Sequence, residues 1–219
     1  MVKNALILGA NGSIAKIVVK QLLPQIGGQI TNLTLLVRHP ERLADLDLSN
    51  PNVHVVQADV TDTKQLARIM TGQSLVYANL YGANLGAQAQ SVVAAMCQSH
   101  VTRLVWISAN GVYGEIPGAY GRWNQAMLGD TLTAYADATK VVEASQLDYT
   151  LIRPAWFQDE DEIDYELTVK GQPFKGTEVS RKSVAALVVK LIDQPDQMIG
   201  DSVGISKPNT DGPAPRWYR

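Results

Sequence analysis

The chain has 219 residues, of which 46% are hydrophobic and 18% are charged. This balance is typical of one folded globular domain and excludes a disordered chain. The 19 basic and 21 acidic residues give a formal net charge of −2, so we expect no nucleic-acid partner held by bulk charge. The single cysteine excludes an internal disulfide, and no apolar run approaches the roughly 20 residues that span a bilayer. We therefore expect a cytoplasmic protein that does not contact membranes.

Short apolar runs alternate along the chain with segments in which apolar residues recur at helical spacing. The runs that predict strands are, in chain order, residues 2–8, 33–37, 53–56, 74–80, 104–107, 149–152 and 202–205. The segments that predict helices are residues 14–22, 66–70, 85–98, 135–146 and 184–191. Thr61 or Asp62 is expected to cap the second of these helices and Ser180 the last.

Strands that are apolar on both faces and alternate with helices predict a parallel sheet covered by helices on both sides. The fold class is therefore α/β, with a doubly wound parallel sheet. We expect one domain over residues 1–206, with a very small C-terminal cover segment at about 155–180 and an irregular tail over residues 207–219. Trp217 and Tyr218 of the tail are expected to pack on a neighbouring surface.

The first predicted strand runs directly into the small-residue turn Gly9-Ala-Asn-Gly-Ser-Ile-Ala15, which opens the first helix. A turn in this place presents backbone N–H groups and the positive end of the helix to a phosphate. Gly9 permits the tight turn, and the missing side chain of Gly12 lets a pyrophosphate approach. The alternative is a purely structural turn. The candidate ligands of a dinucleotide here are Gly9, Asn11, Gly12, Ser13 and Ile14.

The turn resembles that of the extended and atypical short-chain dehydrogenase/reductases, in particular the small NmrA-like NAD(P)H-binding group. The resemblance covers nearly the whole chain. Its further motifs are Val37-Arg38-His-Pro-Glu-Arg42, Gln57-Ala-Asp59-Val60, Trp106-Ile-Ser108-Ala109, and Lys140 followed by Leu147-Asp-Tyr-Thr-Leu-Ile-Arg153-Pro154. It implies a Rossmann fold and an NAD(P) cofactor that supplies hydride-transfer chemistry.

Arg38 stands where many NAD-preferring folds carry an acidic residue that holds the adenine ribose. Its guanidinium can instead form a charge-assisted fork with a 2′-phosphate, and Arg42 could add a second positive charge. These residues favour NADP(H) over NAD(H), although two surface arginines are the alternative. The resemblance implies that Asp59 contacts the adenine amino group, whereas a helix-terminal carboxylate is the simpler interpretation. The remaining candidate cofactor-binding residues are Val60, Ala78, Asn79, Leu80, Ser108, Lys140 and Pro154.

The catalytic set of the family does not align fully with this chain. The resembled oxidoreductases use a Tyr-x-x-x-Lys pair, in which the lysine lowers the pKa of the tyrosine. Lys140 matches the lysine, but Ala136 stands four residues before it. Tyr135 is five residues before Lys140, about 140° away around a helix, so the two side chains are not expected to share a face. Lys140 could still hold the ribose hydroxyls, unless it is simply solvated.

The family's catalytic hydroxyl is also displaced, because Ala109 stands at its aligned position. Ser108, one residue earlier, is expected to orient the nicotinamide or to satisfy backbone groups at the strand end. A replacement phenol could come from Tyr113 or Tyr81, although each is equally consistent with wall packing. The candidate catalytic residues are therefore Lys140, Ser108 and Tyr113.

Two functions remain open at this point. One is an NADP(H)-dependent oxidoreductase acting on a small carbonyl compound, and the other is a non-catalytic NADP(H)-binding regulatory or redox-sensor protein. Only 65 residues follow Pro154, which leaves little surface for a large substrate. The acidic run over residues 159–164 is expected to be a solvated loop, with selection of a cationic ligand as the alternative. We expect no metal site, and a homodimer is an open option.

Overall fold

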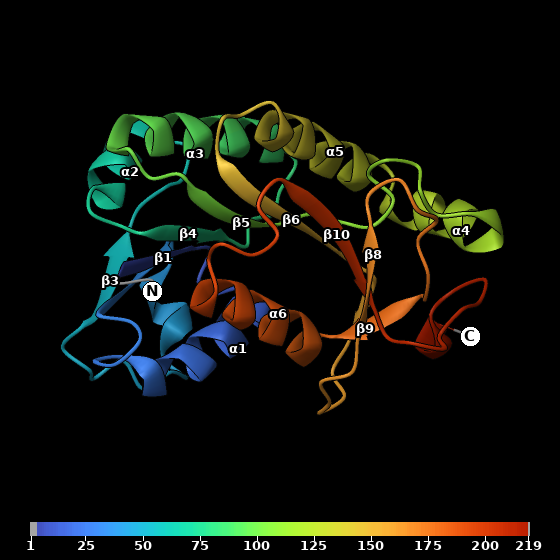
Figure 1. Ribbon diagram of the computed structural model, residues 1–219, viewed down its shortest axis with the longest axis horizontal. Coiled ribbons are helices and arrows are strands. Elements are labelled where there is room, and N and C mark those ends of the chain that lie inside the picture. Colours follow the sequence, from blue (N-terminus) through green and yellow to red (C-terminus); the bar gives the residue numbers. More distant parts are fainter. Residues whose placement is uncertain (1–3, 219) are drawn as a thin grey trace.

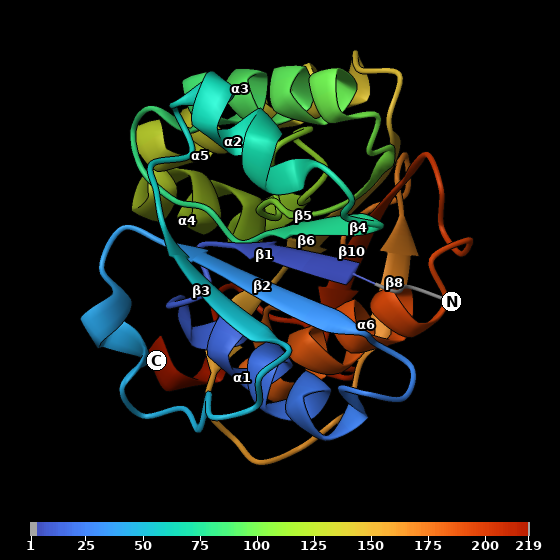
Figure 2. The ribbon, with the colours of Figure 1, turned by 90° about the vertical axis from the view of Figure 1, so that its left-hand side faces the viewer.

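An eight-stranded sheet forms the centre of the computed structural model, which describes residues 4–218 (Figures 1 and 2). Its strand order is β3-β2-β1-β4-β5-β6-β10-β8. The strands are β1 (Asn4–Leu8), β2 (Asn32–Val37), β3 (Val53–Gln57), β4 (Leu75–Ala78), β5 (Arg103–Ile107), β6 (Asp148–Pro154), β8 (Glu166–Val169) and β10 (Asp201–Ser206). All neighbouring pairs are parallel except β8 and β10, which are antiparallel.

Helices cover both faces of the sheet, as Figure 2 shows. One face carries α2 (Thr63–Met70), α3 (Leu85–Ser99) and α5 (Asp130–Glu143), and the other carries α1 (Ser13–Leu22) and α6 (Arg181–Asp193). Each face has its own apolar core, because both surfaces of the central strands are buried. The predicted doubly wound α/β fold is confirmed.

Local signals that place the helices also hold in the structure. The Asp62 side chain accepts a hydrogen bond from the Gln65 N–H, and the Ser180 side chain accepts one from the Ser183 N–H, so both are N-caps. Of the predicted first strand, Val2 and Lys3 lie outside the described residues. Short 3₁₀ turns follow α1 and β2, namely η1 (Leu23–Gln25) and η2 (Pro40–Leu43).

Several elements near the cover segment were not predicted. They are α4 (Gly118–Leu128), the parallel pair β7 (Trp156–Gln158) and β9 (Glu178–Ser180), and the edge strand β8. The tail ends in the 3₁₀ turn η3 (Arg216–Tyr218). The Tyr218 ring lies 4.9 Å from the Trp123 ring, and Trp217 lies 6.2 Å from Trp156. The predicted packing of the two tail aromatics is therefore confirmed.

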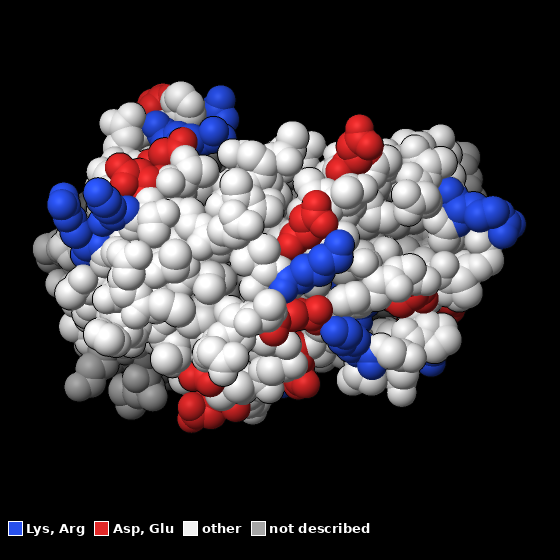
Figure 3. Space-filling view, turned by 90° about the horizontal axis from the view of Figure 1, so that it is seen from above, with Lys and Arg blue, Asp and Glu red and all other residues white. Residues whose placement is uncertain are grey.

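The outer face over α2, α3 and α5 carries scattered charges of both signs and no continuous basic patch (Figure 3). Helix α3 contributes none of these charges, since its fifteen residues include no acidic or basic side chain. Within residues 4–218, no helix is both long and apolar enough to cross a membrane.

Candidate functional site

Two adjoining cavities lie at the carboxyl ends of the strands, where the strand order reverses between β1 and β4. The first cavity, of about 310 Å³, is lined from β2 and β3, and the second, of about 500 Å³, from β5 and β6. Both volumes fall in the range of small-ligand sites, about 300–1,000 Å³. The cavities share Gly12, Asn79, Leu80 and Tyr81. We call the two together the groove.

The glycine turn separates the two cavities and begins α1. Gly9 has a φ of +71°, and a Cβ there would lie 2.4 Å from the Asn79 carbonyl oxygen, so only glycine fits. A Cβ on Gly12 would lie 2.1 Å from the Asn79 side-chain amide. The missing side chain of Gly12 therefore also leaves room for the Asn79 side chain in its present position, in addition to the predicted approach of a pyrophosphate. No side chain caps α1, so its first N–H groups remain available to an anion.

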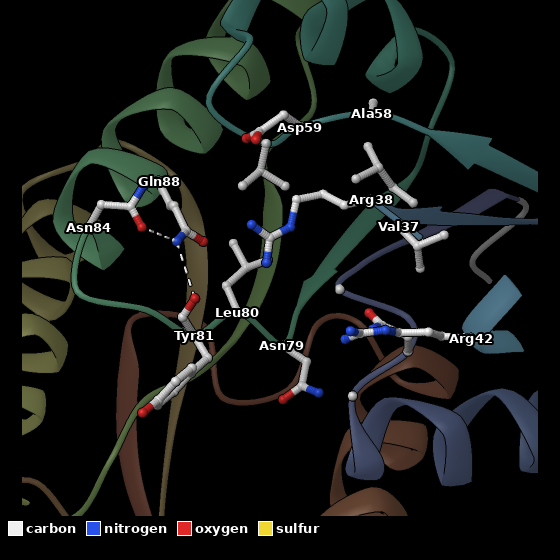
Figure 4. A pocket seen from close by; sticks show the side chains of 15 residues that line it. Val37, Arg38, Arg42, Ala58, Asp59, Asn79, Leu80, Tyr81, Asn84 and Gln88 are labelled. Carbon is white, nitrogen blue, oxygen red and sulfur yellow. Dashed lines mark hydrogen bonds between the residues drawn. The ribbon is translucent and has the colours of Figure 1, made fainter. Parts of the chain in front are cut away.

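Two arginines face the first cavity, as Figure 4 shows. The Arg38 guanidinium points into the cavity from the end of β2, and that of Arg42 points into it from η2. Among the described residues, no hydrogen bond or ion pair is formed by either guanidinium. Two cations facing a cavity without a bonded partner make this part of the groove a site for an anionic group.

Asp59 lies on the far wall of the first cavity, after β3. The backbone N–H and the hydroxyl of Thr61 donate to its Oδ1 at 2.8 Å and 2.7 Å. These bonds, with a smaller contribution from Arg38, lower the pKa of Asp59 below its usual value. The carboxylate is thus held ionised and oriented at the rim of the cavity.

Among the described residues, no charged side chain lines the second cavity. Its apolar residues include Ile14, Leu80, Ile107, Met127, Leu128, Trp156 and Phe157. Its polar side chains are Ser13, Asn79, Tyr81, Ser108, Asn110, Thr131 and Tyr135. A cavity of this composition fits an uncharged, largely apolar ligand.

Helix α5 contributes Tyr135 to the lining of the second cavity and places Thr139 against Ser108. Tyr135 lines the cavity, and the Thr139 hydroxyl lies 2.8 Å from the Ser108 hydroxyl, which also lines it. Burial, with the nearby Tyr81, raises the pKa of Tyr135 to about 12. The two α5 residues are four positions apart and share a face, as helix geometry requires.

The structure places Lys140, a predicted catalytic and cofactor-binding residue, outside both cavities. Its side chain is 76% exposed and pairs with Asp137 at 3.1 Å, and it lines neither cavity. The reason is helical phase, since Lys140 follows Thr139 by one residue and so points away from the groove. The prediction that Tyr135 and Lys140 occupy different faces is confirmed.

Tyr113, the predicted replacement phenol, also lies away from the groove. Its hydroxyl donates to Glu143 Oε1 at 2.6 Å and lies 3.0 Å from Ser202 Oγ, outside both cavities. Burial and the Glu143 carboxylate raise the pKa of Tyr113. Ala78 is fully buried in the core beneath α2, α3 and α5 and does not line the groove.

The other predicted cofactor-binding residues do line the groove. In the first cavity these are Gly9, Asn11, Gly12, Arg38, Arg42, Asp59, Val60, Asn79 and Leu80. In the second they are Gly12, Ser13, Ile14, Asn79, Leu80, Ser108 and Pro154. Their contacts with a cofactor stay predictions.

Glu115 fixes the loop between β5 and α4, which supplies Ala109 and Asn110 to the second cavity. Its carboxylate accepts hydrogen bonds from the backbone N–H groups of Gly111 and Tyr113 at 3.0 Å and 2.9 Å. It also forms an ion pair with Arg153, whose side chain is fully buried. Charge-assisted bonds of this kind hold the loop in one geometry.

Three carboxylates of the acidic run in the cover segment form ion pairs with lysines of the chain. Asp161 pairs with Lys182 at 2.5 Å, and Glu162 pairs with Lys207 at 2.7 Å. Lys207 also reaches Glu160 at 3.0 Å. Within residues 4–218, no group of three or more His, Cys, Asp or Glu side chains is placed to hold a metal ion.

Sequence reasoning missed several residues of the second cavity. Met127, Leu128 and Thr131 come from α4 and the start of α5, whose outlines the apolar pattern did not show. Thr139, which contacts Ser108 but does not itself line the cavity, was overlooked because the family spacing was anchored on Lys140. Counting four residues forward from Tyr135 would have found it.

A family model for NAD(P)H-binding proteins matches residues 9–195. The chain belongs to this NAD(P)H-binding family. No curated protein matches the chain at a significant level. The earlier resemblance to atypical short-chain dehydrogenase/reductases is confirmed by this match and by similar solved structures.

Three solved structures illustrate the likeness. A Rossmann-fold NAD(P)-binding family protein from Shigella flexneri is 42% identical, with 97% of each chain covered and a TM-score of 0.83. A short-chain dehydrogenase/reductase from Veillonella parvula, solved in complex with NADP, is 26% identical and has a TM-score of 0.86. The match covers 99% of this chain and 100% of the Veillonella chain. ChuY, an anaerobillin reductase from Escherichia coli O157:H7, is 19% identical, with 96% and 100% covered and a TM-score of 0.77, and shows the fold alone.

The residues of the groove fit the dinucleotide that the family binds. At the turn, the first N–H groups of α1 have no side-chain cap from the described residues. On one side of the turn lie two arginines without a bonded partner among the described residues, and on the other lies a cavity that no described charged side chain lines. This division suits a molecule with a phosphorylated nucleoside at one end and a nicotinamide at the other.

Proposed function

We propose that the chain is an NADP(H)-dependent oxidoreductase that reduces a small, uncharged carbonyl compound. The observation that carries the proposal is the second cavity, which adjoins the glycine turn and which no charged side chain of residues 4–218 lines. Arg38 and Arg42 support NADP(H) as the cofactor, because their guanidinium groups face the first cavity from the end that would receive a 2′-phosphate.

The cofactor, when bound, supplies the hydride, and the chain's own residues bind and orient the cofactor and the substrate. The first N–H groups of α1 receive the pyrophosphate. Ser108, held by Thr139, offers a hydroxyl at the end of β5. Ile14, Trp156 and Phe157 give the second cavity apolar walls, against which an apolar substrate would pack.

Proton supply limits the kind of carbonyl that suits this site. No described lysine, histidine or carboxylate lines the second cavity, and the pKa of Tyr135 is raised to about 12. An efficient general acid has a pKa near neutrality, a property that Tyr135 lacks. The site therefore favours acceptors whose reduced form carries its own negative charge well, such as quinones and other conjugated carbonyls.

A non-catalytic redox sensor is the second candidate function. It is favoured by one observation, the exposure of Lys140, which leaves Tyr135 without the lysine that activates it in the family's oxidoreductases. A sensor needs the cofactor-binding groove but no turnover.

The test is NADPH oxidation with a panel of aldehydes, ketones and quinones, each offered as a neutral compound and as its carboxylated analogue. We expect turnover with neutral quinones or conjugated ketones and much less with the charged analogues. The variant Thr131→Asp, which places a charge in the cavity lining, should lower kcat/KM for neutral substrates about tenfold or more. The matched control is Thr133→Asp, on an exposed position of the same helix.

Two results would reject the oxidoreductase proposal. Saturable NADPH binding with no turnover of any panel member supports the sensor instead. Equal turnover of neutral and carboxylated substrates, unaffected by Thr131→Asp, shows that the second cavity does not receive the substrate.

A further inference from the structure

Arg181 lies between the glycine turn and the cover segment. It is the first residue of α6, and its Nε donates to the Ser13 hydroxyl at 3.2 Å. Its Nη1 pairs with Asp159 at 2.6 Å, and its guanidinium lies over the Phe157 ring, 5.2 Å from the centroid. Ser13 and Phe157 both line the second cavity, so Arg181 stands at the rim of the groove beside the first turn of α1.

The electrostatics of this position are unfavourable for a cation. Arg181 stands at the N-terminus of α6 and contacts the first residue of α1, and helix N-termini carry partial positive charge. No acidic side chain occurs in the first turn of either helix. The paired carboxylate, Asp159, is 83% exposed, whereas the Arg181 side chain is only 26% exposed. An exposed carboxylate balances such a charge weakly.

Positive potential from two helix ends and one guanidinium thus gathers beside Ser13. A pyrophosphate held at the first N–H groups of α1 would lie next to that hydroxyl. It carries two negative charges and oxygens that match the fork of a guanidinium, so it is a stronger partner than one exposed carboxylate.

We propose that Arg181 is a cofactor-binding residue that exchanges Asp159 for the pyrophosphate of the bound dinucleotide. The inference rests on the proposed function in that the dinucleotide occupies the glycine turn. Asp159 is then a built-in competitor for Arg181. Its release frees the acidic end of the cover segment whenever the cofactor is bound.

The experiment measures dissociation constants by titration and needs no turnover. The probes are NADPH and NADH, which both contain the pyrophosphate, and 2′-AMP, which contains only the nucleoside and the 2′-phosphate. Arg181→Ala should weaken NADPH and NADH alike, by about tenfold, and leave 2′-AMP unchanged. Asp159→Asn should tighten both dinucleotides about two- to fivefold, because it removes the competitor.

The neighbouring ion pair provides the matched control. Lys182 and Asp161 join the same two segments at 2.5 Å, and neither of them lines the groove. Lys182→Ala and Asp161→Asn should leave all three dissociation constants unchanged. Arg181→Gln serves as a second variant if Arg181→Ala unfolds, and thermal unfolding of each variant reports its stability.

Two outcomes would overturn the inference alone. One is that the wild-type chain binds NADPH and that Arg181→Ala binds NADPH as tightly as Lys182→Ala does. The other is a loss of affinity in Asp159→Asn, which would make the Arg181–Asp159 pair a structural support of the groove. Failure of the wild-type chain to bind either dinucleotide would instead overturn the proposed function, and the inference with it.

Discussion

At the scale of single residues, the proposed preference for NADP(H) over NAD(H) depends on Arg38. It follows β2 directly, and its guanidinium enters the first cavity without a bonded partner among the described residues. An arginine here cannot accept hydrogen bonds from ribose hydroxyls, but it can bind a 2′-phosphate through a charge-assisted fork.

Arg38→Ala should therefore weaken NADPH much more than NADH. Loss of one charge-assisted contact costs about 1.5–3 kcal/mol, or roughly ten- to a hundredfold in affinity. We expect a change below about threefold for NADH, which has no 2′-phosphate. Fluorescence titration of both cofactors measures the effect, with Arg68→Ala on the exposed side of α2 as the control. Equal losses for the two cofactors would contradict the role given to Arg38.

Substitution of Tyr135 tests whether this chain uses a tyrosine as its acid catalyst, as the family's oxidoreductases do. Its pKa is raised to about 12 by burial, and Lys140 is too exposed to lower it. Because the raised pKa keeps the phenol protonated, the rate should show no tyrosine ionisation from pH 6 to about 9. Tyr135→Phe should change turnover less than about threefold, whereas a true proton donor contributes about a hundredfold or more. A collapse in kcat for Tyr135→Phe would restore the ordinary dehydrogenase mechanism.

The sequence predicted the residues of the first cavity better than those of the second. Arg38 directly follows β2 and Asp59 lies two residues after β3, so strand ends located them. Lys140 lies outside the groove because a one-residue offset within a helix rotates a side chain by about 100°. A family motif read along the sequence does not reveal that rotation, whereas the contact between Thr139 and Ser108 does.

At the scale of elements, the loop after β5 depends on a buried ion pair. Glu115 accepts from two backbone N–H groups of the loop and pairs with Arg153. Arg153 also donates to the Ser202 hydroxyl at 3.1 Å, which ties the loop to β10. The loop therefore holds one wall of the second cavity against the sheet.

Glu115→Gln should lower the free energy of unfolding by about 3 kcal/mol, because it leaves the buried Arg153 charge without its partner. Chemical denaturation measures the change. Asp45→Asn is the control, since Asp45 pairs with Lys16 at 2.5 Å on the surface and its loss should have no measurable effect. An equal effect of the two substitutions would show that the Glu115 pair does not support the loop.

The elements that the sequence did not predict were missed for a shared physical reason, which is that their local sequence signals are weak. Helix α4 contains Gly118 and Gly121, both poor helix formers, and only two of its residues are buried. Strands β7 and β9 have three residues each and pair with one another across the cover segment. Such short strands are stabilised by partners that are distant in the sequence. The local spacing of apolar residues gives no information about those partners. The central strands were predicted because they are buried on both faces.

At the scale of the whole molecule, the reversal of strand order between β1 and β4 produces the groove. The glycine turn lies at this switch point and the two cavities lie on either side of it, which is where open α/β sheets bind their ligands. The alternation of strands and helices was enough to predict this arrangement. The closure of the second cavity was not predictable, since it depends on Trp156 and on aromatic residues of α4 and the tail.

The most direct measurement is a fluorescence titration of NADPH into the wild-type chain and two glycine variants. Gly12→Val places a branched side chain at the turn, where even a Cβ would lie 2.1 Å from the Asn79 amide. Gly28→Val is the matched control, because a Cβ there meets no atom closer than 3.5 Å. We expect saturable binding by the wild-type chain and by Gly28→Val, and a loss of about tenfold or more for Gly12→Val in a folded protein. Equal NADPH affinity in all three would contradict the placement of the dinucleotide at the glycine turn.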